Sequence, residues 1–136
     1  MIIPESAQKF MANKPVIALA TCDKEGKPNV APMLQYWWYD ENTLVIGDFF
    51  MKTTRKNIEK NGWASFCGWD LESGEAYKFT GPARYTTNGA EYDMANNKMR
   101  QKKPDKNYRG VVIITITHVY DMKSGPTAGN LISGGN

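Results

Sequence analysis

The sequence has little of what side-chain catalysis and metal binding require. Its 136 residues include one histidine, His118, and two cysteines, Cys22 and Cys67. One histidine cannot supply a histidine-based metal centre, and a Ser–His–Asp triad would have no alternative histidine to draw on. The cysteines lie in separate apolar runs without a second ligand at metal-binding spacing, which predicts free thiols. No carboxylate pair stands out either, so we expect any chemistry to come from a bound cofactor that the protein positions.

Strong net charge and long apolar runs are also lacking. The 17 basic and 14 acidic residues leave a net charge of +3, too small and dispersed to indicate nucleic acid or a membrane as the main partner. No apolar run reaches the length of a membrane span, and the N-terminus lacks the pattern of a signal peptide. We therefore expect a cytoplasmic protein that forms a single domain over residues 1–136, with a Gly-rich tail over 121–136.

The hydrophobic pattern predicts a mainly β chain with flanking helices. Helices are expected over 4–13, 53–62 and 88–103, and strands over 15–22, 28–39, 44–46, 63–69, 75–86 and 111–119. Pro32 predicts a bulge or a sheet edge, because proline cannot donate to a strand ladder, and the Gly81-Pro82 pair predicts a second bulge. Six short strands favour a closed or nearly closed antiparallel barrel, and the G-x-G-x-x-G motif of a dinucleotide-binding sheet is missing.

The most informative stretch is LVIGDFFMKTTRKNIEKNG, from Leu44 to Gly62. It predicts a buried strand that passes through a short loop into a helix, and the first turn of a helix has unpaired N–H groups that attract anions. Lys52, Thr53, Thr54 and Arg55 add charge and hydroxyl donors, while the apolar sequence FFM lies immediately before them. The pattern fits a phosphate carried by a flat, largely apolar molecule. A helix that is merely capped by threonine, with solvated basic residues, stays open as the alternative.

The second informative stretch is the proline-bearing strand APMLQY, which begins at Ala31. A bulge at Pro32 would free backbone polar groups beside it, and Gln35 adds a hydrogen-bond donor. Met33 and Leu34 could form apolar walls. A flavin ring needs such polar groups at its pyrimidine edge and apolar walls at its faces, although Met33 and Leu34 could equally be core residues.

Four segments in this order resemble the FMN-binding split-barrel superfamily, which includes proteins related to pyridoxamine phosphate oxidase, small FMN-binding proteins and flavin reductases. The segments read ALATCDKEGKPNVAPMLQYWW, LVIGDFFMKTTRKNI, AYKFTGPARYTTNGAEYD and GVVIITITHVYDMKSGPTAG. The resemblance extends from about Val16 to about Leu131 and implies a six-stranded antiparallel split β-barrel. The chain lacks the basic substrate-binding segment of pyridoxamine phosphate oxidase itself, so that specific activity is not carried over.

The resemblance implies a set of residues that bind FMN. Lys52, Thr53 and Thr54 would hold the phosphate, with Asn57 nearby. The strand residues Pro32, Met33, Leu34 and Gln35 would lie along the isoalloxazine ring, and Ile46, Gly47 and Asp48 would close over it. The family is typically a homodimer with flavin at the subunit interface, for which Trp37, Trp38, Trp69 and the tail are candidate contacts.

Several functions agree with this reading. The first is an FMN-dependent oxidoreductase that uses NAD(P)H or passes electrons to a small acceptor. The second is an FMN-binding electron carrier without substrate turnover, and the third is a split barrel that binds a deazaflavin or haem instead. A small β-barrel that binds single-stranded nucleic acid is the alternative from another class, with Trp37-Trp38-Tyr39 and the basic residues between Lys98 and Lys103 as its signal.

Overall fold

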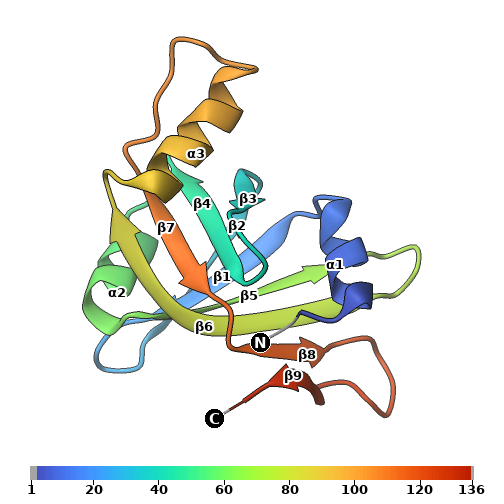
Figure 1. Cartoon of the computed structure of the whole chain (residues 1–136). Coiled ribbons are helices and arrows are strands. Elements are labelled where there is room, and N and C mark those ends of the chain that lie inside the picture. Colours follow the sequence, from blue (N-terminus) through green and yellow to red (C-terminus); the bar gives the residue numbers. More distant parts are fainter. Residues whose placement is uncertain (1–2, 136) are drawn as a thin grey trace.

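The computed structural model describes residues 3–135, and Figure 1 shows the arrangement of its elements. The ends of the expected 1–136 domain, residues 1, 2 and 136, lie outside the described part. The three helices in that part are α1 (Glu5–Ala12), α2 (Thr53–Asn61) and α3 (Ala90–Arg100). Its nine strands are β1 (Ile17–Cys22), β2 (Pro28–Met33), β3 (Tyr36–Trp38), β4 (Thr43–Asp48), β5 (Trp63–Trp69), β6 (Ala76–Thr86), β7 (Gly110–Thr115), β8 (His118–Asp121) and β9 (Leu131–Gly134).

All recorded strand pairs are antiparallel, and they form two sheets that share β6. The main path runs β2-β1-β5-β6-β7-β4-β3, while β8 pairs with β6 and β9 pairs with β8. Figure 1 shows β6 as a long curved strand that passes from one sheet to the other. This confirms the mainly β, antiparallel split-barrel class with flanking helices.

The expected count of six strands is too low for residues 3–135, because two expected strands are divided and the tail contains a further one. The strand expected over 28–39 is interrupted at Leu34-Gln35, where the chain crosses from the sheet of β1 to the sheet of β4. The strand expected over 111–119 is interrupted at 116–117. Residues of the Gly-rich tail return as β9 and pair with β8. Composition alone gives no signal for this pairing, since β9 reads only LISG.

The two predicted irregularities have different outcomes. Pro32 lies in β2, which pairs in unbroken register with β1 and forms the edge of the sheet, so the edge prediction is confirmed and no bulge occurs there. The register of β6 is likewise unbroken across Gly81-Pro82. The extra residue lies opposite, because two residues of β6 (81–82) face three of the partner segment (115–117). Gly81 is required there, since a Cβ atom would lie 1.8 Å from the Thr115 carbonyl oxygen.

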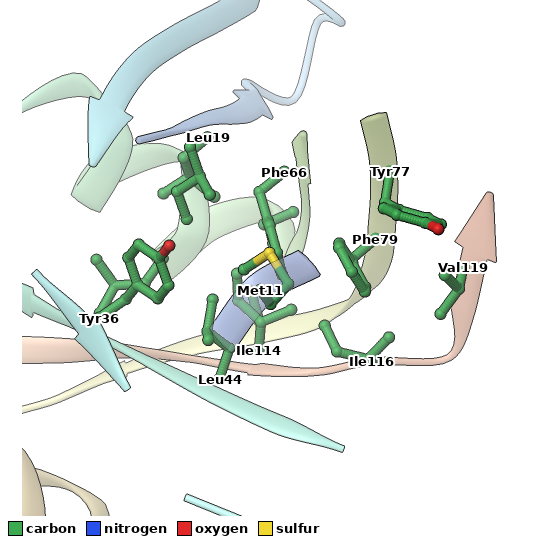
Figure 2. Close-up of a cluster of buried hydrophobic side chains, with 14 of the residues drawn as sticks. Met11, Leu19, Tyr36, Leu44, Phe66, Tyr77, Phe79, Ile114, Ile116 and Val119 are labelled. Carbon is green, nitrogen blue, oxygen red and sulfur yellow. The ribbon is translucent and has the colours of Figure 1, made fainter. Parts of the chain in front are cut away.

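The main core fills the space between the two sheets. Figure 2 shows the side chains that meet there from α1 and from strands of both sheets. Phe66 and Phe79 stack with ring centroids 4.8 Å apart, and Phe10 of α1 packs on Tyr77. The predicted apolar face of α1, which consists of Ala7, Phe10 and Met11, is buried as expected.

A second, smaller core lies between α3 and the outer face of β4 and β7. Ala95 and Met99 of α3 pack with Val45, Val111 and Tyr108. The helix is shorter than the expected 88–103, and its N-cap is Gly89, without a side-chain cap. Within residues 3–135, no helix has the length and apolar character needed to cross a membrane.

Candidate functional site

A cleft of about 470 Å³ opens where the chain crosses between the sheets. One wall is the end of β2 with the crossing at Leu34-Gln35. The other wall is the segment that leads from β4 into α2, and Figure 1 locates these elements. The residues that line the cleft are Asn29, Ala31, Pro32, Met33, Leu34, Gln35, Gly47, Phe49, Phe50, Met51, Lys52, Thr53 and Thr54. The two stretches that the sequence singled out therefore face each other across one space.

The N-terminus of α2 offers unpaired donors to this cleft. Its N-cap is Lys52, which makes no side-chain capping bond, and the first intrahelical bond runs from Lys56 N to the Lys52 carbonyl oxygen at 3.1 Å. The N–H groups of the preceding turn have no intrahelical partner. Within the described helix, no acidic residue lies in the first turn. The alternative of a threonine-capped helix is therefore not what the structure shows.

A buried polar cluster fixes Thr54 at the cleft. Asn29 Nδ2 donates to Thr54 Oγ1 at 3.1 Å and lies 3.3 Å from Thr21 Oγ1. Asn57 also donates to Thr21 Oγ1, at 3.1 Å, and is itself buried. The hydroxyl oxygen of Thr54 is occupied as an acceptor, so its proton is available for a ligand in the cleft.

The Asp48 carboxylate holds the loop between β4 and α2 in place through hydrogen bonds and an ion pair. This carboxylate is fully buried and accepts from the Met51 N–H at 2.7 Å and from the Tyr85 hydroxyl at 2.5 Å. Arg109 contacts both carboxylate oxygens at 3.1 and 3.2 Å and donates to the Met51 carbonyl oxygen at 2.8 Å. Burial, together with the hydrogen bond to Asp48 and its charge, raises the pKa of Tyr85 to about 12. Arg55 lies over the Tyr85 ring and pairs with Glu59, and it does not line the cleft.

Gln35 links the β2 wall of the cleft to β4 and to Tyr108. Its carbonyl oxygen accepts from Gly47 N at 2.9 Å, and its side-chain Oε1 accepts from the Tyr108 hydroxyl at 2.6 Å. Leu34 is 68% exposed and Phe50 is 87% exposed, so the cleft has apolar surface on both sides.

A second recess, of about 370 Å³, shares Leu34 and Gln35 with the cleft. Four lysines line it, and no acidic residue of the described chain does: Lys14, Lys98, Lys102 and Lys103. Burial and the charges of Lys102 and Lys98 lower the pKa of Lys14. Trp37 also lines this recess, but Trp38 packs against Phe79 in the core, so successive aromatic side chains do not form a stacking platform.

The eleven predicted site residues fall into two groups. Eight line the cleft: Pro32, Met33, Leu34, Gln35, Gly47, Lys52, Thr53 and Thr54. The other three, Ile46, Asp48 and Asn57, are buried and do not line it. Asp48 and Asn57 support residues that do, through Met51 and through the Thr21 cluster. Ile46 belongs to the core because alternate residues of β4 face opposite sides of the sheet.

Sequence reasoning missed Asn29, Tyr85, Tyr108 and Arg109 at or behind the cleft. Tyr108 and Arg109 fall at the end of the segment 101–109, which reads as a polar, basic loop. Their distance in sequence from Gln35 and Asp48 leaves no local signal, because only the pairing of β4 with β7 brings them there. Asn29 is the exception, since it precedes Ala31 by two residues on one face of a predicted strand.

Comparisons with known proteins agree with this fold. A model of the family described as pyridoxamine 5'-phosphate oxidase matches residues 3–123. An uncharacterized protein of Methanocaldococcus jannaschii is 33% identical over 133 residues, which are 96% of this chain and 88% of that protein. The crystal structure of HupZ from Group A Streptococcus is 28% identical, with a TM-score of 0.82, and the match covers 94% of this chain and 100% of HupZ.

Two more distant structures show the fold alone. An FMN-binding protein from Syntrophomonas wolfei is 13% identical, with a TM-score of 0.73, over 90% of this chain and 87% of that one. HutZ, the heme storage protein from Vibrio cholerae, is 15% identical, with a TM-score of 0.64, over 89% of this chain and 95% of that one.

Proposed function

Because the chain belongs to the pyridoxamine 5'-phosphate oxidase family, we propose that it binds FMN and acts as a flavin-dependent oxidoreductase. One observation supports this above all others. The cleft joins an uncapped helix N-terminus beside Lys52 to apolar walls that suit a flat ring. A cofactor with an anionic phosphate and an aromatic ring matches both halves of this space.

The residues take distinct roles in this proposal. Lys52, Thr53 and Thr54 hold the phosphate, while Pro32, Met33, Leu34, Gln35 and Gly47 lie along the ring. The other three predicted residues do not touch FMN. Asp48 and Asn57 form hydrogen bonds that position residues lining the cleft, and Ile46 packs in the core. Bound FMN would supply the group that takes up and releases electrons, and the protein contributes binding, orientation and electrostatics.

The lysine-lined recess supports NAD(P)H or another anionic electron donor as the reaction partner. It adjoins the cleft through Leu34 and Gln35, and its lysines have no carboxylate partner among residues 3–135. A phosphate-bearing donor there would lie next to the flavin ring. An electron carrier without turnover remains the second candidate, and the recess is the feature that favours an enzyme over it.

The one histidine is not placed to ligate a haem in the cleft. Haem iron takes histidine, cysteine, methionine or tyrosine as its axial ligand, so a haem bound there would need another ligand, such as Met33 or Met51 of the cleft lining. His118 lies in β8, stacks on Tyr120 and shares a hydrogen bond at Nδ1 with Thr117, and it does not line the cleft. A deazaflavin shares the phosphate and the ring with FMN, so only identification of the bound molecule separates those two.

The test is an absorbance spectrum of the freshly purified protein, followed by mass analysis of the molecule that heating releases. We expect flavin bands and the mass of FMN. The mass of a deazaflavin would redirect the proposal within the fold, and a Soret band would establish haem. A colourless protein that takes up no added FMN would exclude both the oxidoreductase and the flavin carrier. With FMN established, oxidation of NADH and NADPH distinguishes the enzyme from the carrier.

We further propose a homodimer that forms through the outer face of the sheet next to the cleft. The register places Val30, Ala20, Trp63 and Trp69 on the side opposite the core. Val30 is 67% exposed, and the two tryptophans are 48% and 46% exposed. This apolar face includes the edge strand β2, so a second copy on it would lie beside the cofactor cleft, as the family resemblance implies.

Light scattering at micromolar concentration is expected to give twice the chain mass of 15.3 kDa. Val30→Lys places a charge on the proposed interface and should shift the mass toward that of one chain. Tyr39→Lys, at a 42% exposed position directly after β3 in the other sheet, makes a comparable change away from this face and should leave the dimer intact. A wild-type protein with the mass of one chain would contradict the shared interface.

A further inference from the structure

Tyr108 is held both at its main chain and at its ring. Its backbone N–H donates to Asn96 Oδ1 at 2.8 Å, and its carbonyl oxygen accepts from the Tyr92 hydroxyl at 2.7 Å, so two residues of α3 fix its main chain. The centroids of the Tyr108 and Phe49 rings are 4.7 Å apart. The Tyr108 ring also lies over Gly47, where a Cβ atom would come within 2.3 Å of the ring. The side chain is only 2% exposed.

The Tyr108 side chain lines the lysine-lined recess and reaches the wall of the cleft through Gln35. The Tyr108 hydroxyl donates to Gln35 Oε1 at 2.6 Å, although Tyr108 does not itself line the cofactor cleft and Gln35 does. Burial raises the pKa of Tyr108 above its usual range, so the hydroxyl keeps its proton and remains a donor.

The hydroxyl determines which end of the Gln35 amide is free. A glutamine amide has an acceptor end and a donor end, and a hydroxyl has a single proton to donate. With Oε1 on the hydroxyl proton, the NH₂ group is left without a hydrogen-bond partner within residues 3–135, on a side chain that borders both the cleft and the lysine-lined recess. If the amide were reversed, the buried tyrosine proton would lose its acceptor, which is costly.

We propose that Tyr108 is a positioning residue that turns the Gln35 amide so that its N–H group, and not its oxygen, faces the ring of the bound cofactor. This inference rests on the proposed FMN site. The carbonyl oxygens at the pyrimidine edge of a flavin accept hydrogen bonds, and they gain electron density when the ring is reduced. A donor fixed there stabilises reduced FMN more than oxidised FMN.

Tyr108→Phe removes the hydroxyl and keeps the ring, so the amide is no longer oriented. We expect oxidised FMN to bind about threefold to tenfold more weakly, as for the loss of one hydrogen bond. Reduced FMN should lose about a further tenfold in binding affinity. This difference lowers the two-electron midpoint potential of the bound flavin by about 30 mV. Both quantities are measured without turnover, by fluorescence titration and by redox titration of the absorbance.

Two comparisons separate positioning from a purely structural effect. In a Gln35→Leu background, adding Tyr108→Phe should change neither the affinity nor the potential, because the group on which Tyr108 acts is gone. Tyr36→Phe is the matched control, since Tyr36 is also buried and its hydroxyl donates to the Pro15 carbonyl oxygen, away from the cleft.

The other possible results contradict either the proposed FMN binding or the positioning role of Tyr108. If wild-type protein binds no flavin, the proposed function fails, and this inference fails with it. If wild-type protein binds FMN and Tyr108→Phe matches it in affinity and potential, only the inference fails. A Tyr108→Phe effect that persists in the Gln35→Leu background, or that Tyr36→Phe reproduces, assigns Tyr108 a structural role instead.

Discussion

Replacing Lys52 with alanine is expected to weaken FMN binding by several-fold to about a hundredfold, because a charge-assisted contact with the phosphate is lost. Lys52 is the N-cap of α2 and lines the cleft, and among residues 3–135 no carboxylate pairs with it. Its ammonium group is therefore available to a ligand. Quenching of flavin fluorescence during titration measures the change.

Riboflavin makes this experiment specific for the phosphate. It has the same ring as FMN and no phosphate, so Lys52→Ala should leave riboflavin affinity nearly unchanged. Lys56→Ala removes an equal charge one turn along the same helix, at an exposed position outside the cleft, and should have little effect on either ligand. An equal loss for FMN and riboflavin would place Lys52 at the ring or assign it a role in folding, and unchanged FMN affinity would remove it from the site.

Replacing Asp48 with asparagine is expected to lower the free energy of unfolding by about 3 kcal/mol, the lower end of the range for breaking a buried ion pair, because Arg109 is half-exposed. Asparagine has nearly the same size, but it replaces one carboxylate oxygen with a donor. That donor would face the donor groups of Met51, Tyr85 or Arg109. Urea unfolding of the cofactor-free protein at a fixed concentration measures the change.

Asp70→Asn is the matched control for this substitution. Asp70 also accepts bonds from a backbone N–H and a hydroxyl, those of Glu72 and Ser73, and these bonds lower its pKa, but it lies in an exposed turn. Its replacement should shift the urea midpoint far less. Equal shifts for the two variants would show that the buried contacts of Asp48 add no more to stability than those of an exposed turn. Asp48→Asn should also weaken FMN binding, because the Asp48 carboxylate fixes the loop that places Met51 and Lys52 at the cleft.

Local pattern was enough to predict most elements and one wall of the cleft. The turn from β4 into α2 was predictable because its strand, loop and helix are contiguous in sequence, and Gly62 ends α2 in the left-handed conformation as its residue type suggests. The apolar face of α1 was predictable from its helical period. The strand breaks at 34–35 and 116–117 were not, since they arise where a strand changes partners, and partner choice is a property of the whole sheet.

The residues behind the cleft were unpredictable for a related reason. The resemblance placed Asp48 over the ring, and its role behind the loop had no local signal because its partners Tyr85 and Arg109 are 37 and 61 positions away. Asn57 looked like a ligand on the first turns of α2, yet helix geometry directs it toward Thr21 and the interior. The family resemblance indicated which segments lie near the cleft, but not which of their side chains line it.

The curved strand β6 has a consequence for how the molecule opens. It bonds to β5 along most of its length and to β8 and β7 in turn on its other edge, so both sheets depend on it. Neither sheet can separate without breaking its ladders, and amide protons there should exchange with solvent only through global unfolding. The cleft is bounded instead by the edge strand β2 and a loop. Hydrogen exchange at the cleft can therefore respond to a ligand while the amides of β6 serve as an internal reference for the stability of the whole domain.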